Sequence, residues 1–305
     1  MRERYALICV PVATLWSSPE SPRPIDAPAL GDHPDYQKWL GQMTKEQTIA
    51  LCTDKRIQTQ ALFGESVRIE EERQGWMRIT IPAQPTLKSR AGYPGWLPSA
   101  QIAERCLYPS LPMRNIIVHQ QLAPLKLTTG RLLELSYATF LPLIGRTDDQ
   151  LTVATPLGMA SLRTKDCVLP QQQRPRTGIE IVRDGAQFMN LAYLWGGTSS
   201  FGFDCSGFCY AVFRANGYLI PRDAADQYRR GVIIENGAER PGDLLFFAEQ
   251  EGRGRVHHVG IYAGSQQMLH SPTPGAAVSL TRLPGTDYAR ELCGIRRYWQ
   301  PRDSG

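Results

Sequence analysis

The chain has 305 residues, of which 42% are apolar and 21% charged, a composition typical of a soluble globular protein. The formal net charge of +5 is spread along the chain, and no Lys/Arg block is longer than a pair, which argues against nucleic-acid binding. At this length we expect two or three domains, each with its own hydrophobic core.

The cysteines and the N-terminal segment bear on the compartment. Seven cysteines at irregular spacings, with no CxxC pair, argue against a disulfide framework or a zinc ribbon and fit a reducing compartment. The start MRERYALICVPVATLW superficially resembles a signal peptide. However, Pro11 interrupts its apolar run, no small-residue cleavage site follows, and the segment alternates like a strand. Since no apolar stretch approaches the ~20 residues that span a bilayer, we expect a cytoplasmic protein.

The first domain, predicted over residues 1–105, is a small β-barrel with a helical insertion. Residues 5–16 are predicted to form a strand that ends in a Pro-rich loop, and residues 34–52 have helical composition. Strand patterns then return in ALFGESVRIEEER, GWMRITIPA and YPGWLPSAQI, separated by turn residues.

A second β-rich domain is predicted over residues 106–170. Its strand candidates are RNIIVHQQLAPLKL, RLLELSYATFLPLIGRT, DQLTVATPLG and MASLRTKDCVLP. The two domains end similarly, in GWLPSAQI and ASLRTKDCVLP, which indicates two copies of one small β fold.

The third domain, predicted over residues 171–305, has a different pattern. The polar segment PQQQRPRT forms a linker, and helices are predicted over residues 178–192 and 205–217. Four strand candidates follow: DLLFFAEQ, HHVGIYAG, QQMLHSP and CGIRRYW. Helices followed by an antiparallel sheet predict an α+β domain.

Cys205, in FGFDCSGF, follows a Gly-rich turn and opens the second predicted helix, with Asp204 as its N-cap. A cysteine at a helix N-terminus faces unpaired backbone N–H groups and the positive end of the macrodipole, and both favour the thiolate. Ser206 and Gly207 keep the first turn small enough for a substrate to approach. These features make Cys205 a candidate nucleophile.

Two histidines could serve this nucleophile. In VHHVGIY, alternation places His258 and Tyr262 on one strand face and His257 on the other. A three-residue loop of Ala263, Gly264 and Ser265 would pair Tyr262 with Gln266 and set His270 directly opposite His258. A two-residue loop would instead pair His270 with Val259 and break the site.

Thiol chemistry needs this arrangement, because a base must take the thiol proton and a third group must fix the tautomer of that base. Cys205, His258 and His270 would fill these roles in that order. The hydroxyl of Tyr193, in YLWGG, could lie beside the developing oxyanion, together with backbone N–H groups at the helix start.

The motifs YLWGGTSSFGFDCSGF, HVGIY and LHS resemble those of the NlpC-type peptidoglycan cysteine peptidases, which have a circularly related papain-like fold. The resemblance covers about residues 178–299. It implies a papain-like catalytic domain with the nucleophile, base and orienting residue in the order found here.

The two upstream domains resemble the paired bacterial SH3-like barrels of one subgroup, the γ-D-glutamyl-L-diamino-acid endopeptidases of the dipeptidyl-peptidase VI type. The resemblance implies hydrolysis of the bond between γ-D-Glu and the diamino acid, Lys or meso-diaminopimelate, in murein peptides that have a free N-terminal L-Ala. It further implies a role in murein peptide recycling. We expect a monomer that needs no cofactor or metal.

The resemblance also assigns substrate-binding residues. It implies that Asp223, in PRDAADQ, is the carboxylate that receives the substrate amine. It further implies that Glu65 and Tyr93 of the first barrel assist Asp223 in this role. Ala224 departs from the Ser found in many relatives. A carboxylate partner for a buried ammonium agrees with physical expectation. The remaining pocket positions that match are Trp195, Asp204 and Ser206.

Structural roles compete with these assignments. Asp204 could act only as an N-cap, His270 could be a satisfied polar strand residue, and Trp195 could simply pack. Without the resemblance, Glu65 and Tyr93 would be taken as plain surface residues. Cys209, one turn after Cys205, is expected in the core.

Two other functions remain open at this point. Cys205, His258 and His270 could be zinc ligands of a hydrolase, although no close ligand pair such as HxxxH is present. Alternatively, the β domains could serve a non-catalytic protein that binds the cell wall, although a complete catalytic set argues against this function.

Overall fold

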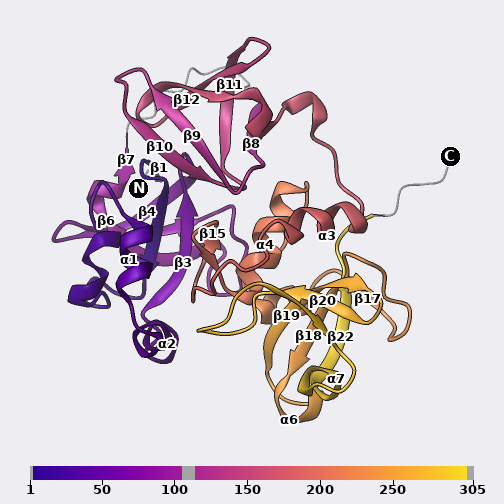
Figure 1. Ribbon diagram of the computed structural model, residues 1–305. Coiled ribbons are helices and arrows are strands. Elements are labelled where there is room, and N and C mark those ends of the chain that lie inside the picture. The colour runs from indigo at the N-terminus through magenta and orange to yellow at the C-terminus, as the bar shows by residue number, and fades with distance from the viewer. Residues whose placement is uncertain (1–2, 105–113, 301–305) are drawn as a thin grey trace. The chain divides into compact units, whose positions relative to one another are not determined.

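The computed structural model describes residues 3–104 and 114–300. By its internal contacts the chain divides into two units (Figure 1). The first comprises Met1–Ala83, Lys88–Gln173 and Ser199–Phe201, and the second comprises Gln84–Leu87, Arg174–Thr198 and Gly202–Gly305. The predicted boundary between residues 105 and 106 lies outside the described residues, and the division into three domains stays a prediction.

The first unit begins with a seven-stranded sheet in the order β3-β2-β6-β5-β4-β1-β7. The single strand predicted over residues 5–16 is wrong, because the chain bends at Cys9–Pro11 and Pro11 has no N–H with which to continue the ladder. The strands are β1 Arg4–Ile8, β2 Val12–Trp16, β3 Ile57–Leu62, β4 Ser66–Arg73, β5 Trp76–Ile81, β6 Tyr93–Pro98 and β7 Ile102–Ala103.

The predicted helical insertion lies between β2 and β3 and consists of two short helices, α1 (Tyr36–Gln42) and α2 (Lys45–Thr53). Each has an N-cap side chain: Asp35 accepts a hydrogen bond from the backbone N–H of Lys38, and Thr44 accepts one from that of Gln47. Short 3₁₀ helices complete this unit at η1 Pro24–Ala29, η2 Ser99–Gln101, η3 Thr164–Asp166 and η4 Pro170–Gln172.

The second sheet of this unit has the order β10-β9-β13-β12-β11-β8-β14. Matched strand for strand in chain order, it repeats the first sheet, so the prediction of two copies of one fold is confirmed. Its strands are β8 Asn115–Val118, β9 Leu122–Leu127, β10 Leu132–Ser136, β11 Phe140–Arg146, β12 Gln150–Thr155, β13 Gly158–Arg163 and β14 Cys167–Val168.

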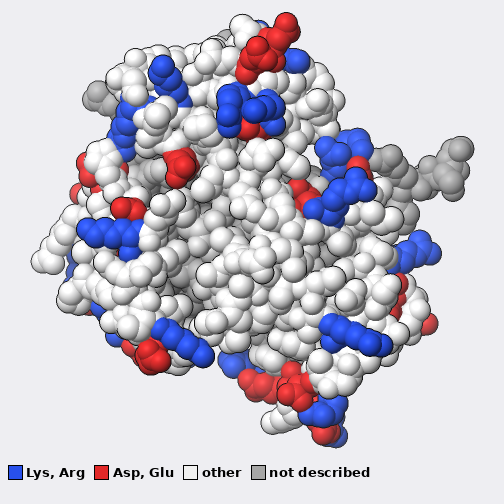
Figure 2. Space-filling model, viewed as in Figure 1, with Lys and Arg blue, Asp and Glu red and all other residues white. Residues whose placement is uncertain are grey.

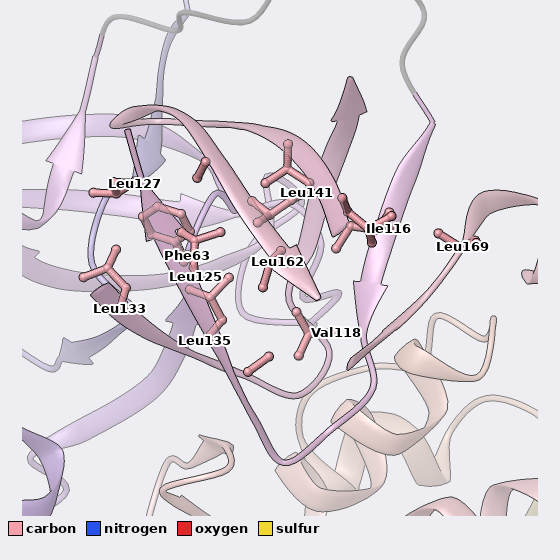
Figure 3. Close-up of a cluster of buried hydrophobic side chains, with 14 residues drawn as sticks. Phe63, Ile116, Val118, Leu125, Leu127, Leu133, Leu135, Leu141, Leu162 and Leu169 are labelled. Carbon is pink, nitrogen blue, oxygen red and sulfur yellow. The ribbon is translucent and has the colours of Figure 1, made fainter. Parts of the chain in front are cut away.

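The core of the second sheet is built from Leu, Ile, Val and Ala side chains that alternate inward along its strands, among them Leu125, Leu135 and Leu162 (Figure 3). Phe63, from the turn after β3 of the first sheet, packs among them and is 1% exposed. A buried aromatic ring contributes roughly 2–3 kcal/mol by removing apolar surface from water. Phe63 therefore ties the two β modules of this unit together.

The second unit is α+β, as predicted, with a six-stranded antiparallel sheet in the order β17-β22-β18-β19-β20-β21. The four predicted strands form its interior, and the short edge strands β17 and β21 were not predicted. The strands are β15 Thr198–Ser199, which straddles the two units, β16 Gly202–Phe203, β17 Val232–Ile234, β18 Leu244–Ala248, β19 Val256–Gly264, β20 Gln267–His270, β21 Ser279–Arg282 and β22 Leu292–Arg297.

The helices of this unit differ from expectation: both predicted helices end early, the second at Ala215, and three short helices that follow it were not predicted. The helix predicted over residues 178–192 ends at Ala186, and Asn190 adopts a left-handed conformation with φ of 70°, which a continuing helix cannot contain. Helix α4 packs against β19, the strand that carries His258. The helices are α3 Gly178–Ala186, α4 Cys205–Ala215, α5 Ala224–Tyr228, α6 Glu249–Gly252 and α7 Asp287–Glu291.

On the face shown in Figure 2, basic and acidic side chains alternate in small groups, and no large patch of one sign is seen there. Among the described residues, no helix is both long and apolar enough to cross a bilayer.

Candidate active site

Cys205 is the first residue of α4, and Asp204 is its N-cap, as the sequence predicts. The Asp204 carboxylate accepts a hydrogen bond of 2.6 Å from the backbone N–H of Gly207. A Cβ at Gly207 would lie 2.0 Å from the carbonyl oxygen of Gly197, so only glycine allows the first turn of α4 to approach the preceding loop this closely. The Gly-rich sequence around Cys205 therefore fixes the position of the helix start.

The environment of the Cys205 thiol opposes ionisation. Cys205 is partly exposed, yet desolvation by the atoms packed around it raises the pKa of its thiol to about 12, and the neighbouring Asp204 charge raises this pKa further. Hydrogen bonding to the backbone of Ser206 and Val259 acts in the opposite direction. Burial therefore opposes the effect expected of the helix terminus on the thiol, and a base must receive the proton, as the sequence analysis expects.

The two predicted histidines, His258 and His270, are hydrogen-bonded to each other in the structure. His258 Nε2 and His270 Nδ1 are 2.7 Å apart, and both side chains are buried. The register that brings them together is not the predicted one. Tyr262 pairs with Met268 and not with Gln266, and continuing this register places Gly260, not His258, opposite His270. His258 and His270 are diagonal neighbours on one face of the sheet.

The turn explains the difference in register. Only Ser265 and Gln266 form the loop, and both have positive φ, 50° and 57°, as a two-residue hairpin turn requires. The prediction that such a loop breaks the site is wrong, because a bulge at Ala263 adds one residue to β19 and returns His270 to the His258 face. Gly260 leaves room beside them: its absent Cβ would lie 3.1 Å from the His270 Cβ.

Burial keeps both imidazoles neutral. Desolvation lowers the pKa of His258 well below its usual value, with smaller effects from His270 and His257, and lowers the pKa of His270 to about 4. The ring of Tyr288, in α7, lies 5.2 Å from that of His258 and 5.3 Å from that of His270. A neutral imidazole can accept a proton, which is what the base for Cys205 requires.

These shifted values predict a pH-dependent stability. The unfolded chain protonates the two imidazoles near pH 6.5, whereas the folded protein does so at lower pH, so their contribution to stability is present above pH 6.5 and is lost as the pH falls toward 4. We expect the free energy of unfolding to decrease between pH 6.5 and 5 by up to about 1.4 kcal/mol per pH unit and per histidine. Urea denaturation at each pH measures this slope. His270→Gln should reduce it, and an unchanged slope in that variant would contradict the prediction.

Sequence reasoning missed a buried arginine beside the nucleophile. Arg222, which is 1% exposed, donates to both oxygens of the Asp204 carboxylate, with Nη2 to Oδ2 at 2.7 Å and Nη1 to Oδ1 at 3.1 Å. Its Nη1 also donates to the Ser206 hydroxyl at 3.0 Å. With the N–H groups of Gly207 and Gly196 also bonded, both Asp204 oxygens are engaged. The N-cap role is the one the structure shows for Asp204, and substrate contact by Asp204 or Ser206 stays a prediction.

Asp223 lies immediately before α5 and is its N-cap residue, although its side chain makes no capping bond. It is partly exposed, and so is Ala224, the position of the departure from the resemblance. Sequence reasoning also missed Asp226, a buried residue of α5 whose carboxylate accepts hydrogen bonds from the hydroxyl of Thr86 and the backbone N–H of Leu87. These contacts hold the segment Gln84–Leu87 in the second unit.

The aromatic candidates of the Gly-rich segment are both in the second unit. Tyr193 is buried and forms an isolated parallel bridge with Phe203, two residues before Cys205. Trp195 is partly exposed. Their predicted roles beside the oxyanion and in the pocket stay predictions.

Glu65 and Tyr93 belong to the first unit, and the expectation of plain surface positions is wrong. Glu65 is 7% exposed, and its Oε2 accepts a hydrogen bond from the backbone N–H of Leu62. Tyr93 is 2% exposed, and its hydroxyl receives a hydrogen bond from the Lys88 ammonium, which also lies over the ring. A buried carboxylate at a turn is uncommon unless it has a partner, so both positions are more constrained than the sequence indicated.

The remaining candidate residues lie outside the pair of histidines. Cys209 is buried in the core, as predicted, and His257 is exposed on the opposite strand face, 3.2 Å from Glu291. Within residues 3–104 and 114–300, no three His, Cys, Asp or Glu side chains are grouped so that they could hold a metal ion, so the zinc alternative finds no ligand group there.

Comparison with known families agrees with the site and with the repeated sheets. Residues 190–297 match the NlpC/P60 family, residues 53–102 match the bacterial dipeptidyl-peptidase Sh3 domain, and residues 118–168 match the YKFC SH3b2 domain. The two β modules are therefore SH3 domains of bacterial type, and the α+β unit has the NlpC/P60 fold.

Whole-chain relatives extend this agreement. The chain is 43% identical to a gamma-D-glutamyl-L-lysine dipeptidyl-peptidase of Bacillus subtilis, over 94% of this chain and 96% of that protein. It is 35% identical to a protein of the same name from Bacillus cereus, over 97% of this chain and 92% of the relative. A crystal structure of an NlpC/P60 family protein from Bacillus cereus superposes with a TM-score of 0.92 at 35% identity, covering 97% of this chain and all of the other. The chain belongs to the NlpC/P60 family of cysteine peptidases.

Proposed function

We propose that this protein hydrolyses the amide bond between γ-D-Glu and the diamino acid in murein peptides that have a free N-terminal L-Ala. The observation that carries this function is the hydrogen-bonded pair of His258 and His270 on the sheet against which the Cys205 helix packs. The two whole-chain relatives, both named for γ-D-glutamyl-L-lysine, support the choice of bond.

The reaction begins with proton transfer. Nε2 of His258 is engaged with His270, so Nδ1 is the atom that takes the proton from the Cys205 sulfur. The sulfur attacks the γ-carbonyl carbon of D-Glu, and the carbonyl π electrons move to oxygen. Backbone N–H groups at the start of α4 and the Tyr193 hydroxyl are proposed to stabilise this oxyanion.

The intermediate then collapses. The C–N bond breaks as the His258 imidazolium gives its proton to the leaving amine of the diamino acid, which leaves a γ-D-Glu thioester on Cys205. Water, deprotonated by His258, attacks the thioester carbonyl and releases the L-Ala-γ-D-Glu dipeptide and the Cys205 thiol. The neutral imidazole and thiol that burial favours are restored at the end of the cycle.

Recognition of the free amine is assigned to Asp223. An ammonium group that leaves water needs a charged hydrogen-bonding partner, which a carboxylate supplies. The proposal includes both L-Lys and meso-diaminopimelate as the diamino acid.

A matched set of peptides tests this function. We expect release of L-Ala-γ-D-Glu from L-Ala-γ-D-Glu-L-Lys and from its diaminopimelate counterpart, and a loss of at least about tenfold in kcat/KM when the L-Ala amine is acetylated, since burying an unpaired carboxylate costs more than 1.4 kcal/mol. Product release is followed by mass spectrometry. Equal cleavage of free and acetylated peptides would remove the N-terminal specificity, and no cleavage of either would remove the proposed bond.

We also propose that the protein acts as a monomer in the cytoplasm, on peptides released from murein for recycling. The irregular, odd-numbered cysteines support a reducing compartment. Among the described residues, Cys9, Cys167, Cys205, Cys209 and Cys293 are free thiols.

A further inference from the structure

His270 has a second hydrogen-bonding partner beyond His258. Its Nε2 lies 2.8 Å from the hydroxyl oxygen of Thr281, on the edge strand β21. In the β20–β21 register Thr281 is opposite Met268, and His270 is opposite Ser279, so the contact is diagonal. Among the described residues, the Thr281 hydroxyl makes no other hydrogen bond.

Three side chains are thus joined in a row: His258 Nε2 to His270 Nδ1, and His270 Nε2 to Thr281 Oγ1. A neutral imidazole carries one donor and one acceptor nitrogen, so the protons in this row can point only in one of two directions. In the first direction, His258 donates to His270 and His270 donates to Thr281. In the second, Thr281 donates to His270 and His270 donates to His258.

Only the first direction is compatible with the reaction. It leaves the lone pair of His258 on Nδ1, where it can accept the Cys205 proton. The second direction places a proton on Nδ1 and abolishes the base. Once His258 is an imidazolium both of its nitrogens donate, so His270 Nδ1 must again accept and His270 Nε2 must again donate.

We propose that Thr281 is a positioning residue whose hydroxyl oxygen accepts the His270 Nε2 hydrogen and thereby holds the tautomer that keeps His258 competent as a base. The inference rests on the proposed function of this site. His270 is 1% exposed, so solvent does not replace a lost acceptor easily. Thr281 acts through His270 and His258 and touches no reacting atom.

Three variants test this role. Thr281→Val keeps the volume and shape of the side chain and removes the acceptor. Thr281→Ser restores the hydroxyl. Ser279→Ala removes a hydroxyl from the same strand and the same face, at the residue opposite His270, where no side-chain hydrogen bond is found among the described residues. With L-Ala-γ-D-Glu-L-Lys as substrate, we expect Thr281→Val to lower kcat about 10- to 100-fold with KM within about twofold, Thr281→Ser to recover most of kcat, and Ser279→Ala to match the wild type.

A spectroscopic readout separates this proposal from the function on which it rests. Imidazole ¹⁵N chemical shifts of histidine-labelled protein report the tautomer without any substrate. We expect the proton of His270 on Nε2 in the wild type and in Thr281→Ser, and partly or wholly on Nδ1 in Thr281→Val. A wild-type proton on Nδ1, or equal kcat losses in the Val and Ser variants, would overturn the proposal. Failure of the wild type to cleave the peptide would overturn the proposed function and leave the tautomer assignment standing.

Discussion

Cys205→Ala is expected to lower peptide turnover about 10³-fold or more, because it removes the sulfur atom that forms the thioester intermediate. The substitution removes one sulfur atom at the partly exposed start of α4, where Asp204 still caps the helix, so the fold should persist. Turnover of L-Ala-γ-D-Glu-L-Lys by the purified variant measures the loss, and thermal unfolding verifies the fold.

Cys209→Ala is the matched control. Cys209 lies one turn further along the same helix and is fully buried, so its loss should lower stability slightly and leave kcat within about twofold. Alkylation with iodoacetamide should inactivate the wild type and the Cys209 variant alike. Undiminished turnover by Cys205→Ala would refute covalent catalysis at this residue.

Arg222→Met is expected to destabilise the second unit by about 3–5 kcal/mol, the largest stability effect that we predict. The substitution keeps the length of the side chain but leaves the Asp204 carboxylate buried without its cation. Because Asp204 also caps α4 and bonds Gly196, the effect should extend to the position of Cys205 and lower kcat. Urea denaturation followed by circular dichroism measures the free energy of unfolding.

Two further variants identify the cause of this loss. Adding Asp204→Asn to Arg222→Met removes the unpaired negative charge at position 204 and should recover part of the stability, since a neutral amide still accepts hydrogen bonds. Arg253→Met disrupts an exposed ion pair with Glu251 and should change stability by less than about 1 kcal/mol. If Arg222→Met proved no more harmful than Arg253→Met, the buried pair would not support the site as described.

The start of α4 was predictable from the sequence because its determinants are local. Asp204 is followed three residues later by the N–H that it caps, and Gly207 lies where the helix approaches Gly197. Such signals lie within a few residues of one another and need no knowledge of the tertiary structure. For the same reason, the two SH3 modules could be recognised as alternating strands separated by turns.

The hairpin register could not be predicted in the same way. The face of the sheet on which His270 lies depends on a bulge at Ala263. Nothing in the local sequence pattern distinguishes a two-residue turn with a bulge from a three-residue loop. The prediction placed His270 on the correct face by a wrong register. Arg222 and Thr281 were missed because their partners are distant in the sequence, so only the folded chain reveals them.

The two SH3 modules share one strand order but differ in the length of one connection between strands. Residues 17–56 connect β2 to β3 in the first copy and include two helices, whereas residues 128–131 make the same connection in the second. A longer connection adds little loop-closure entropy. The same strand order therefore accommodates a large insertion at this point without any strand changing neighbours, which makes this junction tolerant of added surface.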